Sequence, residues 1–245
     1  AGNMEAPPPG ADGPAGLRRP MNHHQRNDFG AVRVSYAGDD LAPRYSTMAD
    51  DSSQSAERRT AAMLFAAAES QLADGGGQDH EEAMRSATDA HAAACASGDS
   101  GLRADGARLA VKAHCLRASC LRYEMGTEAL PLVKDSLGRA RALAEEELAA
   151  LRGDTRGEGA MRLALAEVCL EARSPEERRE GLGHAAAAQG LQQASDQKLE
   201  ATAWLVLAAL HSEDRQRRKA KDAAERALEL SQAAEDRSGE AWALH

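Results

Sequence analysis

One phrase occurs three times in the sequence: GDTRGEGAMRLALA (153–166), SDQKLEATAWLVLA (195–208) and EDRSGEAWALH (235–245). The three stretches align without gaps. Each places an aspartate four residues before a glutamate: Asp154 and Glu158, Asp196 and Glu200, Asp236 and Glu240. The phrase recurs after 42 and then 40 residues. Because a period of about 20–50 residues made of two helices is typical of solenoids, the phrase predicts an all-α fold of repeated helix pairs.

The amino-acid composition also favours helices. Apolar residues make up 42% of the 245 residues, but aromatic residues only 3%. Most of the apolar content is alanine and leucine, the strongest helix formers, whereas strands favour β-branched and aromatic residues. The length is enough for one extended domain or two compact ones. We therefore expect closely packed helices with thin layers of side chains between them.

The chain divides into two parts by its pattern. Residues 1–54 hold six of the eight prolines and show no helical period, which predicts a disordered Pro/Gly-rich tail. In residues 55–245 apolar side chains recur every three or four positions, which predicts eight helices of roughly 15–26 residues. We expect turns between them at 75–79, 97–101, 124–127, 152–157, 172–177, 195–198, 212–214 and 235–239.

The last complete unit carries a family pattern. Its first predicted helix has Trp204, Leu207 and Ala208, and its second has small and apolar residues at Ala220, Ala227, Leu228 and Leu230. With this spacing, Glu200 to Ala241 resembles a tetratricopeptide repeat of the longer kind found in signalling and cell-polarity scaffolds. The earlier helix with Ala83, Ala87 and Ala90 fits the same pattern. The unit at 153–194 departs from it, with Arg162 at the place of the large aromatic residue and Glu180 at that of the small crossing residue.

The resemblance implies a right-handed superhelical solenoid of antiparallel helix pairs over 55–245, with four pairs and the start of a fifth. In this family the first helix of each pair lines a concave groove. The residues that would line it here are Ala160, Leu163, Glu167, Leu170, Thr202, Leu205, Ala209 and Ser212. This lining is mostly small and apolar, which suits a peptide or an amphipathic helix of another protein.

Two functions remain open on this basis. We expect a non-enzymatic scaffold for protein–protein interaction. The alternative is a regulatory repeat segment of a larger enzyme or motor complex whose catalytic domain lies outside this sequence.

The charge of the chain limits its partners. A net charge of −9 and a pI of about 5.4 argue against binding to nucleic acid or to an anionic membrane. The sequence nevertheless contains one basic run: Arg215, Arg217, Arg218, Lys219 and Lys221. This run is a candidate docking site for an acidic partner. The alternative is a hydrated turn between two helices.

The sequence contains no HExxH, CxxC, Walker or GxSxG motif, so we expect no catalytic residue and no cofactor. His91 and Cys95 lie four residues apart on one predicted helix, but no nearby residue completes a zinc ligand set, and we expect no metal. The acidic run Glu145 to Glu147 is predicted to lie on a solvent-exposed helix face.

The four cysteines fall at unrelated spacings inside predicted helices: Cys95, Cys115, Cys120 and Cys169. Such residues are typical of core positions in a reducing compartment, and we expect a cytoplasmic location. The sequence begins with Ala1 and its last phrase opens a helix that has no polar cap, so we expect it to be part of a longer protein.

Overall fold

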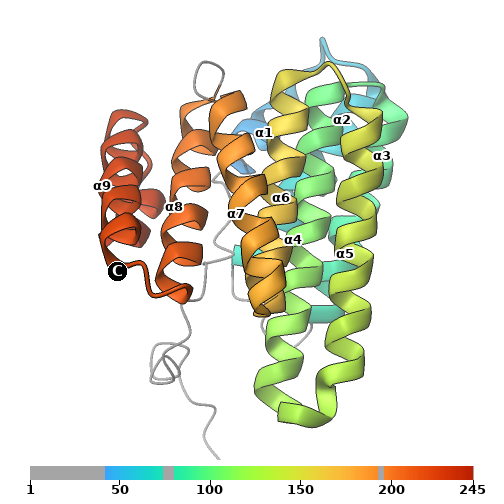
Figure 1. Cartoon of the computed structure of the whole chain (residues 1–245). Helices are drawn as coiled ribbons and strands as arrows, with labels where there is room; N and C mark the ends of the chain where they lie inside the picture. Colours follow the sequence, from blue (N-terminus) through green and yellow to red (C-terminus); the bar gives the residue numbers. More distant parts are fainter. Residues whose placement is uncertain (1–41, 74–79, 193–195, 245) are drawn as a thin grey trace, which may run out of the picture. The chain divides into compact units, whose positions relative to one another are not determined.

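The computed structural model describes residues 42–73, 80–192 and 196–244, all within one unit of the chain, residues 34–245. The described residues form helices joined by short turns, with no strand among them (Figure 1). The helices are α1 (Ala42–Asp50), α2 (Ala56–Ala73), α3 (His80–Ser97), α4 (Ser100–Met125), the 3-10 helix η2 (Gly126–Ala129), α5 (Leu130–Ala150), α6 (Thr155–Ala172), α7 (Pro175–Gln192), α8 (Gln197–Glu213), α9 (Arg217–Ala233) and α10 (Arg237–Leu244).

The all-α prediction is confirmed for the described residues, and so are the predicted turns from 97 onward, each of which lies at a helix boundary. The turn expected at 75–79 lies outside the described residues. No described helix is both long enough and apolar enough to pass through a membrane.

The aspartate of the repeated phrase caps a helix each time. The side chains of Asp154, Asp196 and Asp236 accept hydrogen bonds of 3.1–3.2 Å from backbone N–H groups in the first turns of α6, α8 and α10. Asp99 caps α4 in the same way at 3.0 Å. An N-cap side chain satisfies amide groups that have no partner within the helix. The phrase therefore recurs because each helix of this set begins with the same cap.

The described helices pack in consecutive pairs, and the pairs are joined through one set of helices. The even-numbered helices α2, α4, α6, α8 and α10 each contact the next even-numbered helix; we call them the even row. The backbones of the odd-numbered helices pack closely only against their neighbours in sequence. Some of their side chains reach further, such as Tyr45 of α1 to Asp105 of α4 and Arg141 of α5 to Glu180 of α7. Each even-row helix is thus packed on several faces at once.

Small residues line the crossings between paired helices. Ala227 on α9 and Ala185, 42 residues earlier on α7, are both fully buried. A Cβ atom added to Gly181 would lie 2.8 Å from Cβ of Cys169, so glycine allows α6 and α7 to approach closely. Gly181 is thus one of the small residues at which α7 packs closely on α6, next to Glu180.

Helix α1 lies within the segment 1–54 that the sequence assigned to a disordered tail. It forms because Tyr45 finds a buried site: its ring centroid lies 4.3 Å from that of Phe65, and its hydroxyl donates a hydrogen bond to Asp105. Only 1% of Tyr45 is exposed. The described fold therefore includes residues 42–50, and the predicted boundary near residue 55 is corrected. The tail prediction for 1–41 falls on residues the structure does not describe.

Candidate functional site

Five of the eight residues predicted to line a groove are buried: Ala160, Leu163, Glu167, Leu170 and Ala209. Thr202 and Leu205 are half-buried, and Ser212 is exposed. The reason is the packing of α6, which contacts α4, α5, α7 and α8 and leaves little free surface. The structure therefore does not bring the eight residues together as one open face.

Glu167 illustrates why these residues are interior. Its Oε1 atom accepts a hydrogen bond of 2.9 Å from Nη2 of Arg108 on α4, and each of the two side chains is only 2% exposed. One turn further along α6, Glu171 accepts hydrogen bonds from Ser119 (3.0 Å) and Arg122 (2.9 Å), again on α4. The carboxylates of Glu167 and Glu171 therefore link α6 to α4, two neighbouring helices of the even row, and are not available to bind a partner.

A third polar link lies where α6 and α8 begin. Arg156 lies 2.9 Å from Asp105 of α4 and 3.3 Å from Asp196, the cap of α8. Asp105 also accepts the hydrogen bond from Tyr45, so one carboxylate holds both α1 and α6. Burial, with the charge of Asp105 added, raises the pKa of the Tyr45 hydroxyl far above its usual range. Tyr45 therefore stays a neutral hydrogen-bond donor.

The predicted basic run forms the start of α9 and is on the surface. Arg215, Arg217, Arg218, Lys219 and Lys221 are all exposed. Lys221 lies 3.4 Å from Glu225, one turn along the same helix, and both side chains are well solvated. The first turn of α9 has no acidic residue, and its N-cap side chain makes no capping hydrogen bond. Positive charge accumulates here at the positive end of a helix dipole.

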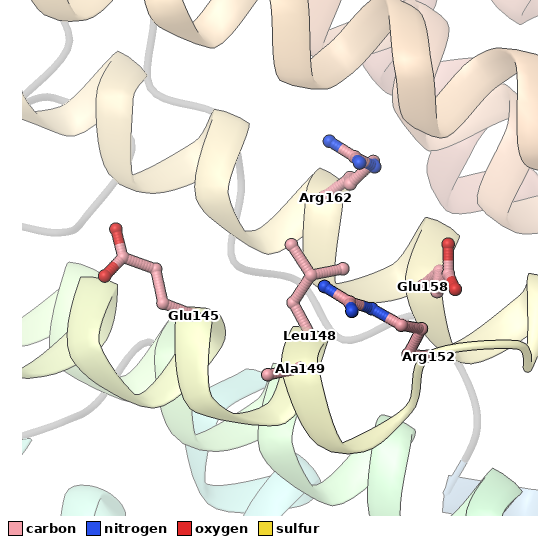
Figure 2. Close-up of a pocket in the computed structure, with 6 residues that line it drawn as sticks. All are labelled: Glu145, Leu148, Ala149, Arg152, Glu158 and Arg162. Carbon is pink, nitrogen blue, oxygen red and sulfur yellow. The ribbon is translucent and has the colours of Figure 1, made fainter.

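A hollow of about 230 Å³ lies between the end of α5 and the first half of α6 (Figure 2). It is lined by Glu145, Leu148, Ala149, Arg152, Glu158 and Arg162. In Figure 2 the Leu148 side chain rises between the two arginines, so an apolar surface separates two guanidinium groups. Small-molecule sites usually measure roughly 300–1,000 Å³. The hollow is better matched to one or two side chains of another molecule.

The two arginines of the hollow are free to bind. Neither Arg152 nor Arg162 makes a hydrogen bond or an ion pair with any residue that the structure describes. The acidic groups beside them have other contacts: Glu158 accepts a hydrogen bond of 2.6 Å from Gly153 N, and Glu145 lies 4.0 Å from Arg141. The formal charges of the lining balance, two arginines against two glutamates, but neither arginine is paired with a carboxylate of the described chain.

The hollow lies where the unit at 153–194 departs from the repeat pattern that the sequence resembles. Arg162 stands 42 residues before Trp204, which packs against the core in the next unit. A half-buried arginine replaces that indole, and its guanidinium lines an opening instead of filling it. The unusual residue is visible in the sequence, but the sequence does not show that Leu148 and Arg152 lie opposite it.

Two cysteines lie in clusters of potential ligand atoms. Cys169, Glu177 and Glu180 surround Arg141, whose guanidinium bonds to all three; it lies 2.7 Å from Glu180 and 3.4 Å from the thiol. The positively charged guanidinium of Arg141 therefore occupies the place that a metal ion would take. Burial raises the pKa of the Cys169 thiol to about 12, so the thiol stays protonated at neutral pH.

The second cluster joins His91 and Cys95 to Glu147 of α5. Glu147 is only 3% exposed, so the prediction that this residue lies on a solvent-exposed face was wrong. It pairs with Arg103 through two hydrogen bonds of 2.6 and 3.0 Å, and its Oε1 lies 3.3 Å from Nε2 of His91. Burial, with the charge of Glu147 added, raises the pKa of the Cys95 thiol. Activated cysteine nucleophiles have a lowered pKa instead.

Comparisons of the chain with protein-family models, with curated proteins and with solved structures find no match.

Proposed function

We propose that this chain is a non-enzymatic interaction module of the tetratricopeptide kind, with its helix pairs arranged as a right-handed solenoid. The alternation of packing supports this proposal, because close backbone packing between successive pairs runs through the even row. Small residues at the crossings support it as well, since the helices of such repeats approach closely. The partner is another protein and the location cytoplasmic; neither nucleic acid nor a membrane is a partner.

The observation that carries the proposal is the pair of uncommitted arginines in the hollow between α5 and α6. Arg152 and Arg162 flank Leu148, so the hollow fits an aspartate or glutamate next to an aliphatic side chain. Arginine binds carboxylates through charge-assisted hydrogen bonds, which contribute about 1.5–3 kcal/mol each. The net charge of −9 opposes an acidic partner, but salt screens it beyond about 8 Å under physiological conditions. At contact distance the unpaired guanidinium groups of Arg152 and Arg162 attract a carboxylate, against repulsion from Glu145 and Glu158 in the same lining.

The test is a selection of displayed random peptides on the immobilised full chain, followed by affinity measurements with the peptides recovered. We expect peptides with a carboxylate beside leucine or isoleucine. Replacing Arg162 by glutamate weakens their binding by at least ~10-fold, since 1.5 kcal/mol corresponds to about that factor. The matched control carries the same change of charge at Arg218, on the basic run of α9.

The outcomes separate the two basic surfaces. If Arg162→Glu weakens binding and Arg218→Glu does not, the hollow is the site. If the reverse holds, the partner binds at α9 and the hollow is not its site. If the recovered peptides contain no acidic residue, the proposal fails for both surfaces.

A further inference from the structure

We propose that His91, Cys95 and Glu147 form a zinc site that fastens α3 to α5. His91 and Cys95 lie one turn apart, so their side chains share one face of α3. Glu147 reaches the same place from α5. One ligand atom from each residue lies within 4.8 Å of the other two. This inference is independent of the proposed partner and of the hollow.

The distances agree with tetrahedral coordination. Cys95 Sγ and Glu147 Oε1 each lie 3.3 Å from His91 Nε2. Zinc bonds of about 2.0–2.1 Å to nitrogen, 2.0–2.2 Å to oxygen and 2.3 Å to sulfur place tetrahedral ligands about 3.3–3.6 Å apart. The two distances to His91 Nε2 therefore lie within a few tenths of an ångström of those in a tetrahedral site, and Sγ and Oε1 lie within 4.8 Å of each other.

The arrangement around the imidazole fits a chelate and not a catalytic relay. In a triad the nucleophile and the acid contact different ring nitrogens. Here the thiol and the carboxylate both face Nε2 of His91. A shared nitrogen is what a metal ion between the three groups requires.

Arg103 supports the carboxylate from behind. Its Nε donates to Oε2 of Glu147 at 2.6 Å, and its Nη2 to Oε1 at 3.0 Å. On binding zinc, Glu147 keeps the stronger bond through Oε2 and turns Oε1 to the ion. Carboxylate ligands are commonly held in this way by an outer partner. The thiolate and the carboxylate neutralise the two charges of zinc, and the arginine adds one positive charge to the assembly.

The comparison with the other cysteine cluster strengthens this choice. There, Arg141 lies among Cys169, Glu177 and Glu180 and bonds to all three, so its guanidinium takes the place of an ion. In the cluster of His91 the guanidinium bonds to the carboxylate alone. Cys95 is exposed, which gives zinc a path from solvent and leaves room for water as the fourth ligand.

The site would join two helix pairs. Helices α3 and α5 both pack on α4 and their backbones do not pack against each other, although the side chains of His91 and Glu147 meet at 3.3 Å. Zinc bound to His91, Cys95 and Glu147 links them directly, and Cys95 releases its thiol proton on binding. We therefore expect the segment from α3 to α5 to become more rigid when zinc is bound.

The test uses the full chain, kept reduced and freed of metal by a chelator, then titrated with cobalt(II). We expect a thiolate-to-cobalt charge-transfer band in the near ultraviolet that saturates at one equivalent and disappears when zinc is added. Cys95→Ser abolishes the band. His91→Gln weakens cobalt binding by at least ~10-fold. Zinc at about 100 times its Kd raises the melting midpoint by roughly 5–10 °C.

Two controls make the result decisive. His184→Gln removes a histidine that faces a carboxylate (Glu180, 3.5 Å) one turn away on α7, and Cys169→Ala removes the thiol of the other cluster. Both variants keep the band if the site is correct. The proposal is overturned if the wild type shows no band, if the band survives Cys95→Ser, if His91→Gln binds cobalt like the wild type, or if Cys169→Ala removes the band.

Discussion

Replacing Arg108 and Glu167 by methionine, singly and together, measures how far burial determines the value of an ion pair in this fold. The two side chains meet at 2.9 Å between α4 and α6, and each is only 2% exposed. Methionine has a similar length and no charge, so the substitutions remove the electrostatic interaction while filling most of the space.

The magnitudes follow from that burial. Removing one partner leaves the other as an uncompensated charge in the interior, which costs about 3–5 kcal/mol. The second carboxylate oxygen, Oε2 of Glu167, has no hydrogen-bond partner among the described residues, so Arg108→Met leaves this carboxylate poorly solvated. Replacing both partners removes both charges and is close to neutral in comparable buried pairs. We therefore expect single losses of about 3–5 kcal/mol and a coupling energy of at least about 3 kcal/mol.

The assay is urea unfolding followed by far-ultraviolet circular dichroism, with all four members of the cycle. The exposed pair of Arg226 and Glu229 serves as the control, because its distance is 2.8 Å but its side chains are 46% and 67% exposed. The same substitutions there should change stability by less than about 1 kcal/mol. A coupling energy at Arg108 and Glu167 as small as that of the control pair would refute the argument from burial.

Four further outcomes are expected. Ala227→Glu buries an unpaired charge in a helix crossing and should cost several kcal/mol, roughly 3–5, so an unchanged melting curve would reject the register of α9. Tyr45→Ala should cost about 3–5 kcal/mol and expose α1 to proteolysis; cleavage no faster than in the wild type would show that α1 is not held by this residue. Burial and nearby arginines lower the pKa of His114, so the unfolded chain binds its proton first. Stability should therefore fall as the pH drops below about 6.5, and His114→Gln should flatten this slope; a wild-type slope of opposite sign would be inconsistent with the burial of this ring. With a disulfide reagent, exposed Cys95 should react well before buried Cys169, and equal rates would contradict their burial.

The helix boundaries could be predicted from the sequence because they depend on local chemistry. Asp154, Asp196 and Asp236 each cap a helix through backbone groups two or three residues away, so the signal and the structure lie in the same short stretch. Helix α1 was not predicted, because it depends on contacts with distant parts of the chain. Its stability depends on Phe65 and Asp105, which lie far along the chain from Tyr45.

The candidate sites were harder to predict for the same reason. Glu147 and Glu167 look like surface carboxylates on helices, and their partners stand 44 and 59 residues earlier in sequence. Nothing in the local pattern of either residue indicates burial. Arg162 did stand out as a departure from the repeat, but the hollow it lines also needs Leu148 and Arg152 from the end of the preceding helix and its turn.

The buried charges suggest a hypothesis about how neighbouring pairs find their register. Alanine faces allow helices to approach closely, but one alanine is much like the next, so a shift by one turn loses little contact energy. The ion pair of Arg108 with Glu167 has a fixed position and direction, and a shift would leave both charges unpaired. On this hypothesis the doubly methionine-substituted chain stays about as stable as the wild type but packs less uniquely. Increased binding of a hydrophobic dye at unchanged stability would support the hypothesis, whereas wild-type dye binding would show that the alanine faces alone specify the register.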